Sequence, residues 1–251
     1  MPFYEREKEL LEVIEKAECI SMQALLKNQY TSVSTLRRDL IKLEEKGLIL
    51  RTRGGVMAVK KSPDDKIAFF LRESEKPLEK KLIAQKAAKL VKDGDTVMLD
   101  ASTSAYCIIP YIAESCKDII VITSGAKASY LLGELGIKNI CTGGQMINRS
   151  FSYIGQIAEK TIAQYNADIA FFSCRGLSPD GYLTDNSIEE NDLRRSMMQH
   201  SKRKVLLCNS SKFDNTCLNN LCHISEIDEI ISDAEIPQKI ADMVGKNTCI
   251  R

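Results

Sequence analysis

Short apolar segments alternate with polar loops and helical stretches through most of the chain, and this alternation constrains the fold more than any other feature. The apolar segments have the length and composition of buried strands. They cover residues 96–99, 119–122, 140–142, 168–172, 205–208 and 229–232, the last of which we expect to be the final strand. Helices are expected over 79–91 and near 155–165, and Pro110 should kink or shorten the helix that follows the first strand. This repetition predicts a largely parallel sheet with helices on both faces.

Polar loops follow the predicted strands, at the edge where parallel sheets bind ligands. The loops 100–104 and 123–125 bring hydroxyls and backbone amides to the start of helices, which favours an anion such as phosphate. Gly143 and Gly144 permit close approach of a backbone, and Lys212 adds a positive charge. One such loop is weak evidence, because hydroxyls commonly cap helices. Several on one sheet favour a phosphate-bearing ligand over capping alone.

The N-terminal region has a different pattern, that of three short helices. Apolar residues at helical spacing predict helices over 4–16 and 22–27, and a third that begins after Ser32. Ser21 and Ser32 suit the N-caps of the second and third helices. Gly47 would end the third helix in a left-handed conformation.

The third helix has two different faces, and a hairpin follows it. Aliphatic residues at spacings of three and four should pack inward, and they are Val33, Leu36, Leu40 and Leu43. Hydroxyl and basic residues lie elsewhere on the helix, namely Ser34, Thr35, Arg37, Arg38 and Lys42. The hairpin over 48–58 should turn at Gly54 and Gly55, and it carries Arg51 and Arg53.

Positive charge is concentrated in this region. Residues 27–61 hold nine basic and three acidic side chains, whereas the whole chain has a net charge of only +1. Such a local patch is the electrostatic footprint of a protein that binds a phosphate backbone. Short side chains and arginines near the start of a helix also suit base edges in the DNA major groove. A solvated helix face is the alternative, and it accounts better for the lysines than for the arginines.

Composition excludes several classes of protein. The chain has 251 residues and 44% hydrophobic content, which suits one or two packed domains. No apolar run is long enough to span a membrane, and the charged N-terminus lacks a signal core, so we expect a cytoplasmic protein without membrane contact. Nine cysteines without a CxxC pair indicate reduced thiols. Cys217, Cys222 and His223 come nearest to a metal pattern, and scattered thiols are the favoured interpretation.

The segment STLRRDLIKLEEKGLILRTRGGV, residues 34–56, resembles the winged helix-turn-helix of the DeoR family of bacterial transcription regulators. Members carry a near-identical S-x-x-T-[IL]-R-R-D-L block, followed by L-x-x-x-G-x-[IL]-x-R-x-x-G-G. The pattern of hydroxyl and basic side chains, together with this resemblance, predicts which residues bind DNA. They are Ser21, Ser32, Ser34, Thr35, Arg37, Arg38, Lys42, Arg51 and Arg53.

Residues 70–235 resemble the effector domain of the same family, which is related to ribose-5-phosphate isomerase and typically senses phosphorylated sugars. Three sequence segments show this resemblance, and they are EKKLIAQKAAKLVKDGDTVMLDAST, CTGGQ and NSSKF. Carried over by position, the resemblance implies a sugar-phosphate pocket lined by Asp100, Ser102, Thr103, Ser104, Thr123, Ser124, Gly143, Gly144, Glu190 and Lys212.

Three positions depart from the family pattern. Ser102 stands where glycine is usual, and Ser124 replaces an asparagine. Arg175 stands where many members have an acidic residue, which reverses a charge within the expected pocket. A cation there fits a more anionic ligand and does not fit the proton transfers that carboxylates perform in the related isomerases. Alternatively, Arg175 pairs with Glu189 or Glu190 and the pocket is degenerate.

These patterns together predict an α/β chain with two domains. A winged helix-turn-helix domain would cover 1–58, a linker 59–76, and a Rossmann-like, mostly parallel effector domain 77–251. We interpret Phe69 and Phe70 as packing the linker onto the second domain.

The expected function is that of a regulator, most often a repressor, of a carbohydrate-metabolism operon, controlled by a phosphorylated sugar or a related anionic metabolite. We expect no catalysis and no cofactor, and a homodimer or homotetramer on a double-stranded DNA operator. The alternatives are a sugar-phosphate isomerase with an appended DNA-binding module, and a regulator that has lost its ligand.

Overall fold

Residues Met1–Glu75 and Lys76–Arg251 form separate units in the computed structural model. The structure describes residues 3–17, 19–29, 32–45, 48–52, 55–58 and 69–251. The predicted helix end at Gly47, the hairpin residues Arg53 and Gly54, and residues 59–68 of the predicted linker lie outside the described residues. The rest of that linker contains a helix, α4 (Phe69–Ser74), in which Phe69 is buried. The domain boundaries at 58 and 76 stay a prediction.

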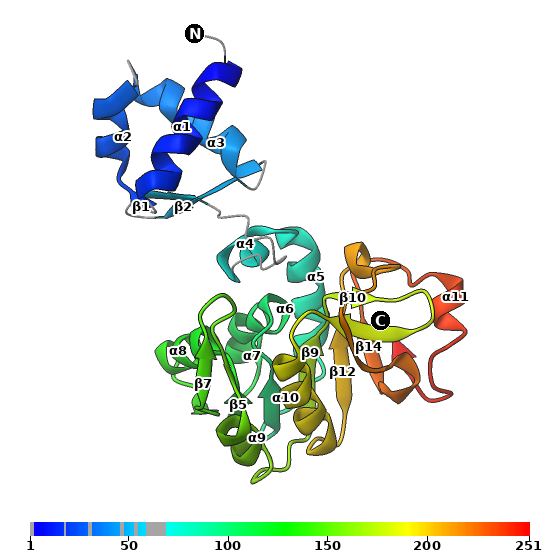
Figure 1. Ribbon diagram of the computed structural model, residues 1–251. Helices are drawn as coiled ribbons and strands as arrows, with labels where there is room; N and C mark the ends of the chain where they lie inside the picture. The colour runs from blue at the N-terminus through cyan, green and yellow to red at the C-terminus, as the bar shows by residue number, and fades with distance from the viewer. Residues whose placement is uncertain (1–2, 18, 30–31, 46–47, 53–54, 59–68) are drawn as a thin grey trace. The chain divides into compact units, whose positions relative to one another are not determined.

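Ahead of α4, three helices and a small antiparallel sheet make up the described residues 3–58 of the first unit (Figure 1). The helices are α1 (Phe3–Ala17), α2 (Met22–Gln29) and α3 (Val33–Glu45). The strands lie in the order β1 (Cys19–Ile20), β3 (Gly55–Ala58) and β2 (Ile49–Thr52). The three helices and the paired strands β2 and β3 agree with the sequence-based expectation, whereas β1 was not expected.

Aliphatic side chains from all three helices and from the sheet form the core of the first unit. Leu36, Leu40 and Leu43 of α3 are fully buried, as their spacing predicted. They pack with Leu10, Ile14, Leu25, Ile49 and Val56. Val33 was expected on the same inward face, and this prediction is wrong because its side chain is 45% exposed. Val33 is the first residue of α3, beyond the end of the packed leucine face.

Gly55 allows β1 to pair closely with β3. A β-carbon at this position would collide with the backbone carbonyl of Ile20 in β1. Ile20 is paired with Val56, next to Gly55, in the antiparallel register. Any side chain at position 55 would therefore push β1 away from the hairpin strands β2 and β3, which form the wing of the predicted winged helix-turn-helix.

A seven-stranded parallel sheet forms the centre of the second unit (Figure 1). The strands lie in the order β15 (Cys249–Ile250), β14 (Glu229–Ile231), β12 (Lys204–Leu207), β9 (Ile169–Ser173), β4 (Thr96–Leu99), β5 (Ile120–Thr123) and β6 (Lys138–Cys141). The predicted parallel sheet is confirmed. The expectation that 229–232 is the final strand is wrong, since β15 follows it at the sheet edge. Two residues are too short an apolar segment to stand out in the sequence.

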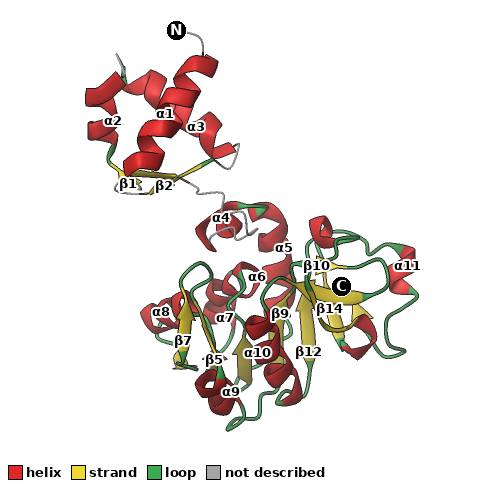
Figure 2. Ribbon diagram, viewed as in Figure 1, coloured by secondary structure: helices red, strands yellow, loops and turns green. Residues whose placement is uncertain are grey.

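Helices cover both faces of the large sheet (Figure 2). One face packs against α5 (Pro77–Ala88), α6 (Thr103–Tyr106), α7 (Ile109–Ser115) and α8 (Ala126–Glu134). The other face packs against α9 (Gln156–Ile162), α10 (Ile188–Gln199) and α11 (Gln238–Ala241). Successive strand residues alternate between the two cores, so Val97 and Leu99 contact the first and Met98 the second. Pro110 lies in the first turn of α7, where a separate helix begins after α6, as expected of a proline.

Several short elements were not anticipated from the sequence. A hairpin joins β7 (Gln145–Ile147) to β8 (Ser152–Ile154). A small antiparallel sheet has the order β10 (Gly176–Leu177), β11 (Tyr182–Asp185) and β13 (Asn219–His223). Two 3-10 helices, η1 (Ser210–Lys212) and η2 (Ile224–Glu226), precede and follow β13.

The direction of strand succession reverses between β4 and β9, which are neighbours in the large sheet. From β4 the chain proceeds outward through β5 and β6, and from β9 it proceeds the opposite way through β12, β14 and β15. The loops after β4 and β9 diverge at this switch point, and such a crevice is where open α/β sheets bind ligands.

Candidate functional sites

The two serines predicted as helix caps do cap α2 and α3. The Ala24 backbone N–H donates to Ser21 Oγ at 3.2 Å, and the Thr35 N–H donates to Ser32 Oγ at 3.2 Å. The hydroxyls of Ser32 and Thr35 are also 2.9 Å apart, and those of Ser32 and Ser34 are 3.1 Å apart. These bonds satisfy backbone donors at the start of each helix and fix where α3 begins.

The outer face of α3 exposes a group of polar and basic side chains. Ser34, Arg37, Arg38 and Lys42 are exposed, while Thr35 is half-buried beside the Ser32 cap. Because the leucines of α3 face the core, these side chains are directed to the surface. The first turns of the helix thus present hydroxyls and guanidinium groups, the donors that suit phosphate oxygens and guanine edges.

Arg51 on β2 forms an ion pair with α3. Its Nε lies 2.7 Å from Glu44 Oε2, and its backbone N–H donates to Glu44 Oε1 at 3.1 Å. The pair therefore fastens the first wing strand to the last turns of α3. The other arginine predicted for the wing, Arg53, lies outside the described residues.

Asp100 lies at the switch point, directly after β4, and three groups of the protein bind its carboxylate. Oδ1 accepts a hydrogen bond from the Ser102 backbone N–H at 3.0 Å. Oδ2 accepts from the Ser173 N–H at the end of β9, at 3.2 Å, and from Arg194 Nε at 2.9 Å. The carboxylate thus joins the loops that follow β4 and β9.

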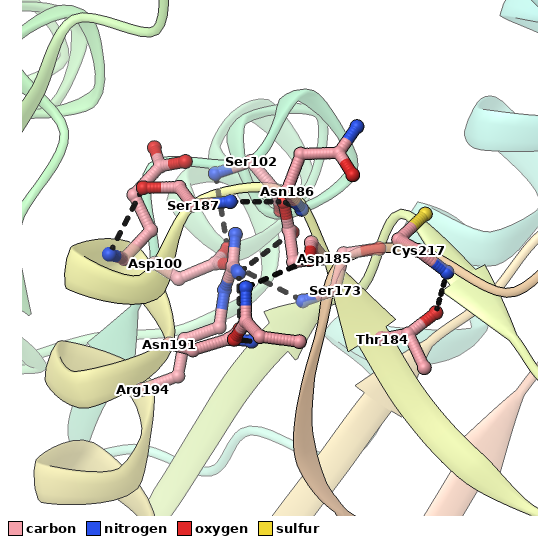
Figure 3. Close-up of polar contacts among 12 residues, drawn as sticks. Asp100, Ser102, Ser173, Thr184, Asp185, Asn186, Ser187, Asn191, Arg194 and Cys217 are labelled. Atoms are coloured by element: carbon pink, nitrogen blue, oxygen red, sulfur yellow. Dashed lines mark hydrogen bonds and ion pairs between the residues drawn. The ribbon is translucent and has the colours of Figure 1, made fainter.

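Arg194 of α10 is the buried cation of this site (Figure 3). Besides Asp100, its Nη1 donates to Asp185 Oδ2 at 2.8 Å and to Asn191 Oδ1 at 3.0 Å. Burial acts to lower the pKa of Arg194, but Asp185 and Asp100 outweigh this effect and raise it. The guanidinium therefore stays charged between two buried carboxylates.

Asp185 at the end of β11 is held as a carboxylate by the same cation. Burial acts to raise its pKa, yet Arg194 and the N–H groups of Asn186 and Ser187 hold the pKa below its usual value. We call Asp100, Asp185, Asn191 and Arg194 the buried cluster. Its members come from the loop after β4, from β11 and from α10, so it connects the large sheet with the small one.

Acid should remove the stabilisation that Asp185 provides. The folded pKa of Asp185 is depressed, so its contribution is present above the unfolded pKa, about 3.9, and is lost as the pH falls through the folded pKa. We expect the unfolding free energies of the wild type and Asp185→Asn, measured in urea, to differ at neutral pH, and the difference to shrink as the pH falls below the unfolded pKa of about 3.9. A difference that stays constant over this range would contradict the assignment.

Lys212 reaches the same edge of the sheet from η1. Its Nζ donates to Ser173 Oγ at 2.6 Å, and Ser173 Oγ donates in turn to the Leu207 carbonyl. Two buried thiols lie nearby. A hydrogen bond from Cys208 lowers the pKa of Cys174, although burial acts to raise it. The positive charge of Lys212 also lowers the pKa of Cys174. Half-buried Lys212 thus supplies positive charge beside the switch point.

The hydroxyl loops predicted for ligand binding are largely buried. Ser102 Oγ caps α6 by accepting from the Ala105 N–H at 3.1 Å, and Thr103 and Ser104 are buried in the first turn. Thr123 Oγ1 accepts from the Gly125 N–H at 3.0 Å, and Ser124 is buried beside it. Both loops follow neighbouring strands, so they meet at one edge of the sheet.

The glycines after β6 have a structural use. Gly143 and Gly144 both have positive φ, and a β-carbon on Gly144 would lie 2.6 Å from the Ile154 carbonyl oxygen. Close approach of a backbone therefore occurs at Gly144, where the partner is β8 of the same chain, whereas a β-carbon on Gly143 would have no neighbour within 4 Å. The role of both glycines in ligand binding stays a prediction.

Arg175 and Glu190 lie at the edges of the site. Both are half-buried, and the Arg175 N–H donates to the Thr184 carbonyl at 2.9 Å, next to Asp185. Glu190 lies in the first turn of α10, where its N–H donates to the Ser187 cap, and its charge helps to raise the pKa of Arg194. The structure joins Asp100, Ser102, Ser173 and Arg194 directly, and Lys212 through Ser173.

Three members of the buried cluster were not predicted from the sequence, namely Asp185, Asn191 and Arg194. One signal was available for the arginine. Arg194 follows Leu193 and lies three residues before Met197, among residues that are buried on α10. A charged residue within such an apolar face needs a buried partner of opposite charge.

The described part of the chain contains no grouping of three histidine, cysteine or acidic side chains that would hold a metal ion. Cys222 lies buried on β13, and burial raises its pKa to about 12. Burial also raises the pKa of Cys217. Among the helices that the structure describes, none has the length and apolar character to span a membrane.

Both units match models of known protein families. Residues 6–62 match the DeoR-like helix-turn-helix domain, and residues 75–234 match the DeoR C-terminal sensor domain. The L-fucose operon activator of Haemophilus influenzae is 31% identical over 236 residues, which cover 94% of each chain. The glycerol-3-phosphate regulon repressor of Escherichia coli is 26% identical over 240 residues, covering 96% of this chain and 94% of the relative.

One solved structure similar to the chain is that of ribose 5-phosphate isomerase A from Methanocaldococcus jannaschii. It aligns with a TM-score of 0.41 and 19% sequence identity, over 53% of each chain.

Proposed function

The chain belongs to the DeoR family of helix-turn-helix transcription regulators, and from this premise we propose that it represses a carbohydrate-metabolism operon until a phosphorylated sugar binds its sensor unit. The observation that carries the ligand half of the proposal is the arrangement at the switch point. Lys212 supplies a cation there through its hydrogen bond to Ser173 at the end of β9, and the hydroxyl loops that follow β4 and β5 lie at the same edge of the sheet.

The DNA half of the proposal rests on the outer face of α3. Arg37, Arg38 and Lys42 are exposed on a helix whose start is fixed by the Ser32 cap. Such a helix enters the major groove with its first turns, while the wing strands lie beside it. A homodimer or homotetramer would place two of these helices on paired half-sites of an operator.

The kind of ligand that the site can bind depends on which of its charged groups are already paired within the protein. Arg194 is bound by Asp100, Asp185 and Asn191, so it stabilises the site rather than offering its charge to a ligand. Lys212 has one hydrogen bond to a neutral hydroxyl, so its positive charge is not cancelled by that partner. A phosphate-bearing sugar matches this cation together with the hydroxyls and backbone amides at the same edge of the sheet. Ligand binding would favour one of two arrangements of the protein, and DNA affinity would change with it.

Lys212→Ala should abolish the response to the ligand and retain DNA binding. Gel shifts would use DNA upstream of the protein's own gene cluster, with and without a panel of sugar phosphates. We expect one sugar phosphate to weaken the complex of the wild type by about tenfold or more, within the usual range of allosteric coupling. The variant should bind the same DNA and ignore that compound. Lys239→Ala on α11 is the matched control and should respond like the wild type.

Two outcomes of this assay would contradict parts of the proposal. Absence of any sequence-specific complex at modest salt would contradict DNA binding. Specific binding that no sugar phosphate alters, together with no thermal stabilisation by the same panel, would indicate a regulator that has lost its ligand. Whether the protein represses or activates is tested by measuring transcription from the same promoter. This transcription should rise when the gene that encodes the protein is deleted.

A further inference from the structure

Two branched aliphatic side chains are exposed on the DNA-facing helix. Val33 is 45% exposed and Ile41 is 41% exposed, whereas Leu36, Leu40 and Leu43 of the same helix are fully buried. Among the described residues, neither Val33 nor Ile41 is a member of the buried core cluster of the first unit. Both side chains therefore lie at the surface of the helix.

Spacing places these side chains among the basic residues. Val33, Arg37 and Ile41 are four residues apart, so they follow one ridge along the helix. Arg38 and Lys42 lie next to this ridge and are also exposed. The face thus alternates methyl groups with positive charges, and both kinds of group meet whatever binds α3.

Duplex DNA offers the matching chemistry. Its phosphates complement Arg37, Arg38 and Lys42, and the C5-methyl of thymine is the apolar group that base edges present in the major groove. We propose that Val33 and Ile41 contact thymine methyl groups and thereby select the operator sequence. This proposal rests on the DNA-binding function proposed above and assigns the specificity that the arginines alone do not supply.

Replacing thymine by deoxyuridine tests the proposal, because it removes only the methyl group. Duplexes that the full-length protein selects from a random-sequence library would be resynthesised with one deoxyuridine at a time. Burial of one methyl-sized group contributes about 0.8 kcal/mol, which corresponds to roughly a fourfold change in affinity. We expect the wild type to lose about this factor at one or two thymines in each half-site.

The variants Val33→Ala and Ile41→Ala should each lose that discrimination at one position, binding thymine and uracil there with equal affinity. Because both side chains are exposed, the substitutions should leave the thermal midpoint unchanged. Leu135→Ala is a matched control, since Leu135 is equally exposed, at 45%, but lies in the other unit. It should keep the deoxyuridine pattern of the wild type.

Two results would overturn the inference while leaving DNA binding intact. The first is a deoxyuridine pattern that is the same in the wild type and in both variants. The second is a change in oligomeric state of Val33→Ala or Ile41→Ala, measured by sedimentation, without a change in that pattern, which would make the ridge a contact between copies of the chain. Failure to select any sequence from the library would instead contradict the proposed function.

Discussion

Arg194→Met should lower the free energy of unfolding of the second unit by about 3–5 kcal/mol, because it leaves two buried carboxylates without their cation. Arg194 Nε and Nη1 lie 2.9 Å from Asp100 and 2.8 Å from Asp185. Methionine matches much of the volume of the side chain, so the loss arises from charge and hydrogen bonding rather than from a cavity. Urea unfolding followed by circular dichroism measures the change.

Two further variants separate this effect from a general sensitivity of the unit. Arg194→Lys keeps the charge but loses the planar fork that reaches both carboxylates, so its stability should lie between the wild type and Arg194→Met. Lys202→Met breaks the pair with Asp168, in which the Lys202 side chain is 75% exposed, and the unfolding midpoint should stay close to that of the wild type. Equal losses for Arg194→Met and Lys202→Met would refute the role assigned to the buried cluster.

Arg37→Ala and Arg38→Ala should each weaken operator binding by about tenfold or more and leave the second unit folded. Loss of a bidentate contact to a base costs about 1–3 kcal/mol, and removal of a phosphate contact adds to this at low salt. Fluorescence anisotropy with labelled operator measures the affinity, and circular dichroism checks the fold. Lys16→Ala removes the same charge from an exposed position on α1, and its affinity should remain within a few-fold of the wild type. Normal binding by both arginine variants would show that α3 does not enter the groove.

The large parallel sheet could be predicted from sequence because most of its strands contain runs of buried apolar residues. The segment expected at 96–99 coincides with β4, since Val97, Met98 and Leu99 are buried on both faces of the sheet and therefore form an unbroken apolar run. The strands β10, β11 and β13 lack this signal. They are short, belong to a small antiparallel sheet and include polar residues such as Asn219 and Asn220.

The site was only partly predictable, for a related reason. Asp100 directly follows β4, and Lys212 lies in η1 shortly after β12, so their position in sequence indicated their position in the fold. Arg194 lies in a helix, where an arginine usually faces solvent. Its burial depends on Asp100, which is 94 residues away, and on Asp185 of another sheet. Local patterns contain no information about such a partner. The prediction that Val33 is buried was wrong because helical spacing indicates which way a side chain points but not where along the helix the packing against the core ends.

The ion pair between Arg51 and Glu44 affects how this protein exchanges ions with its DNA. A basic side chain that binds a phosphate normally releases a cation from the DNA, and this release makes affinity fall as salt rises. Arg51 already has its own neutralising group in Glu44, at 2.7 Å. To bind a phosphate it must give up or share that carboxylate, which stays close by and repels the same phosphate. On the proposed DNA-binding function, we therefore expect the salt sensitivity of the complex to depend on Arg37, Arg38 and Lys42 of α3 more than on Arg51.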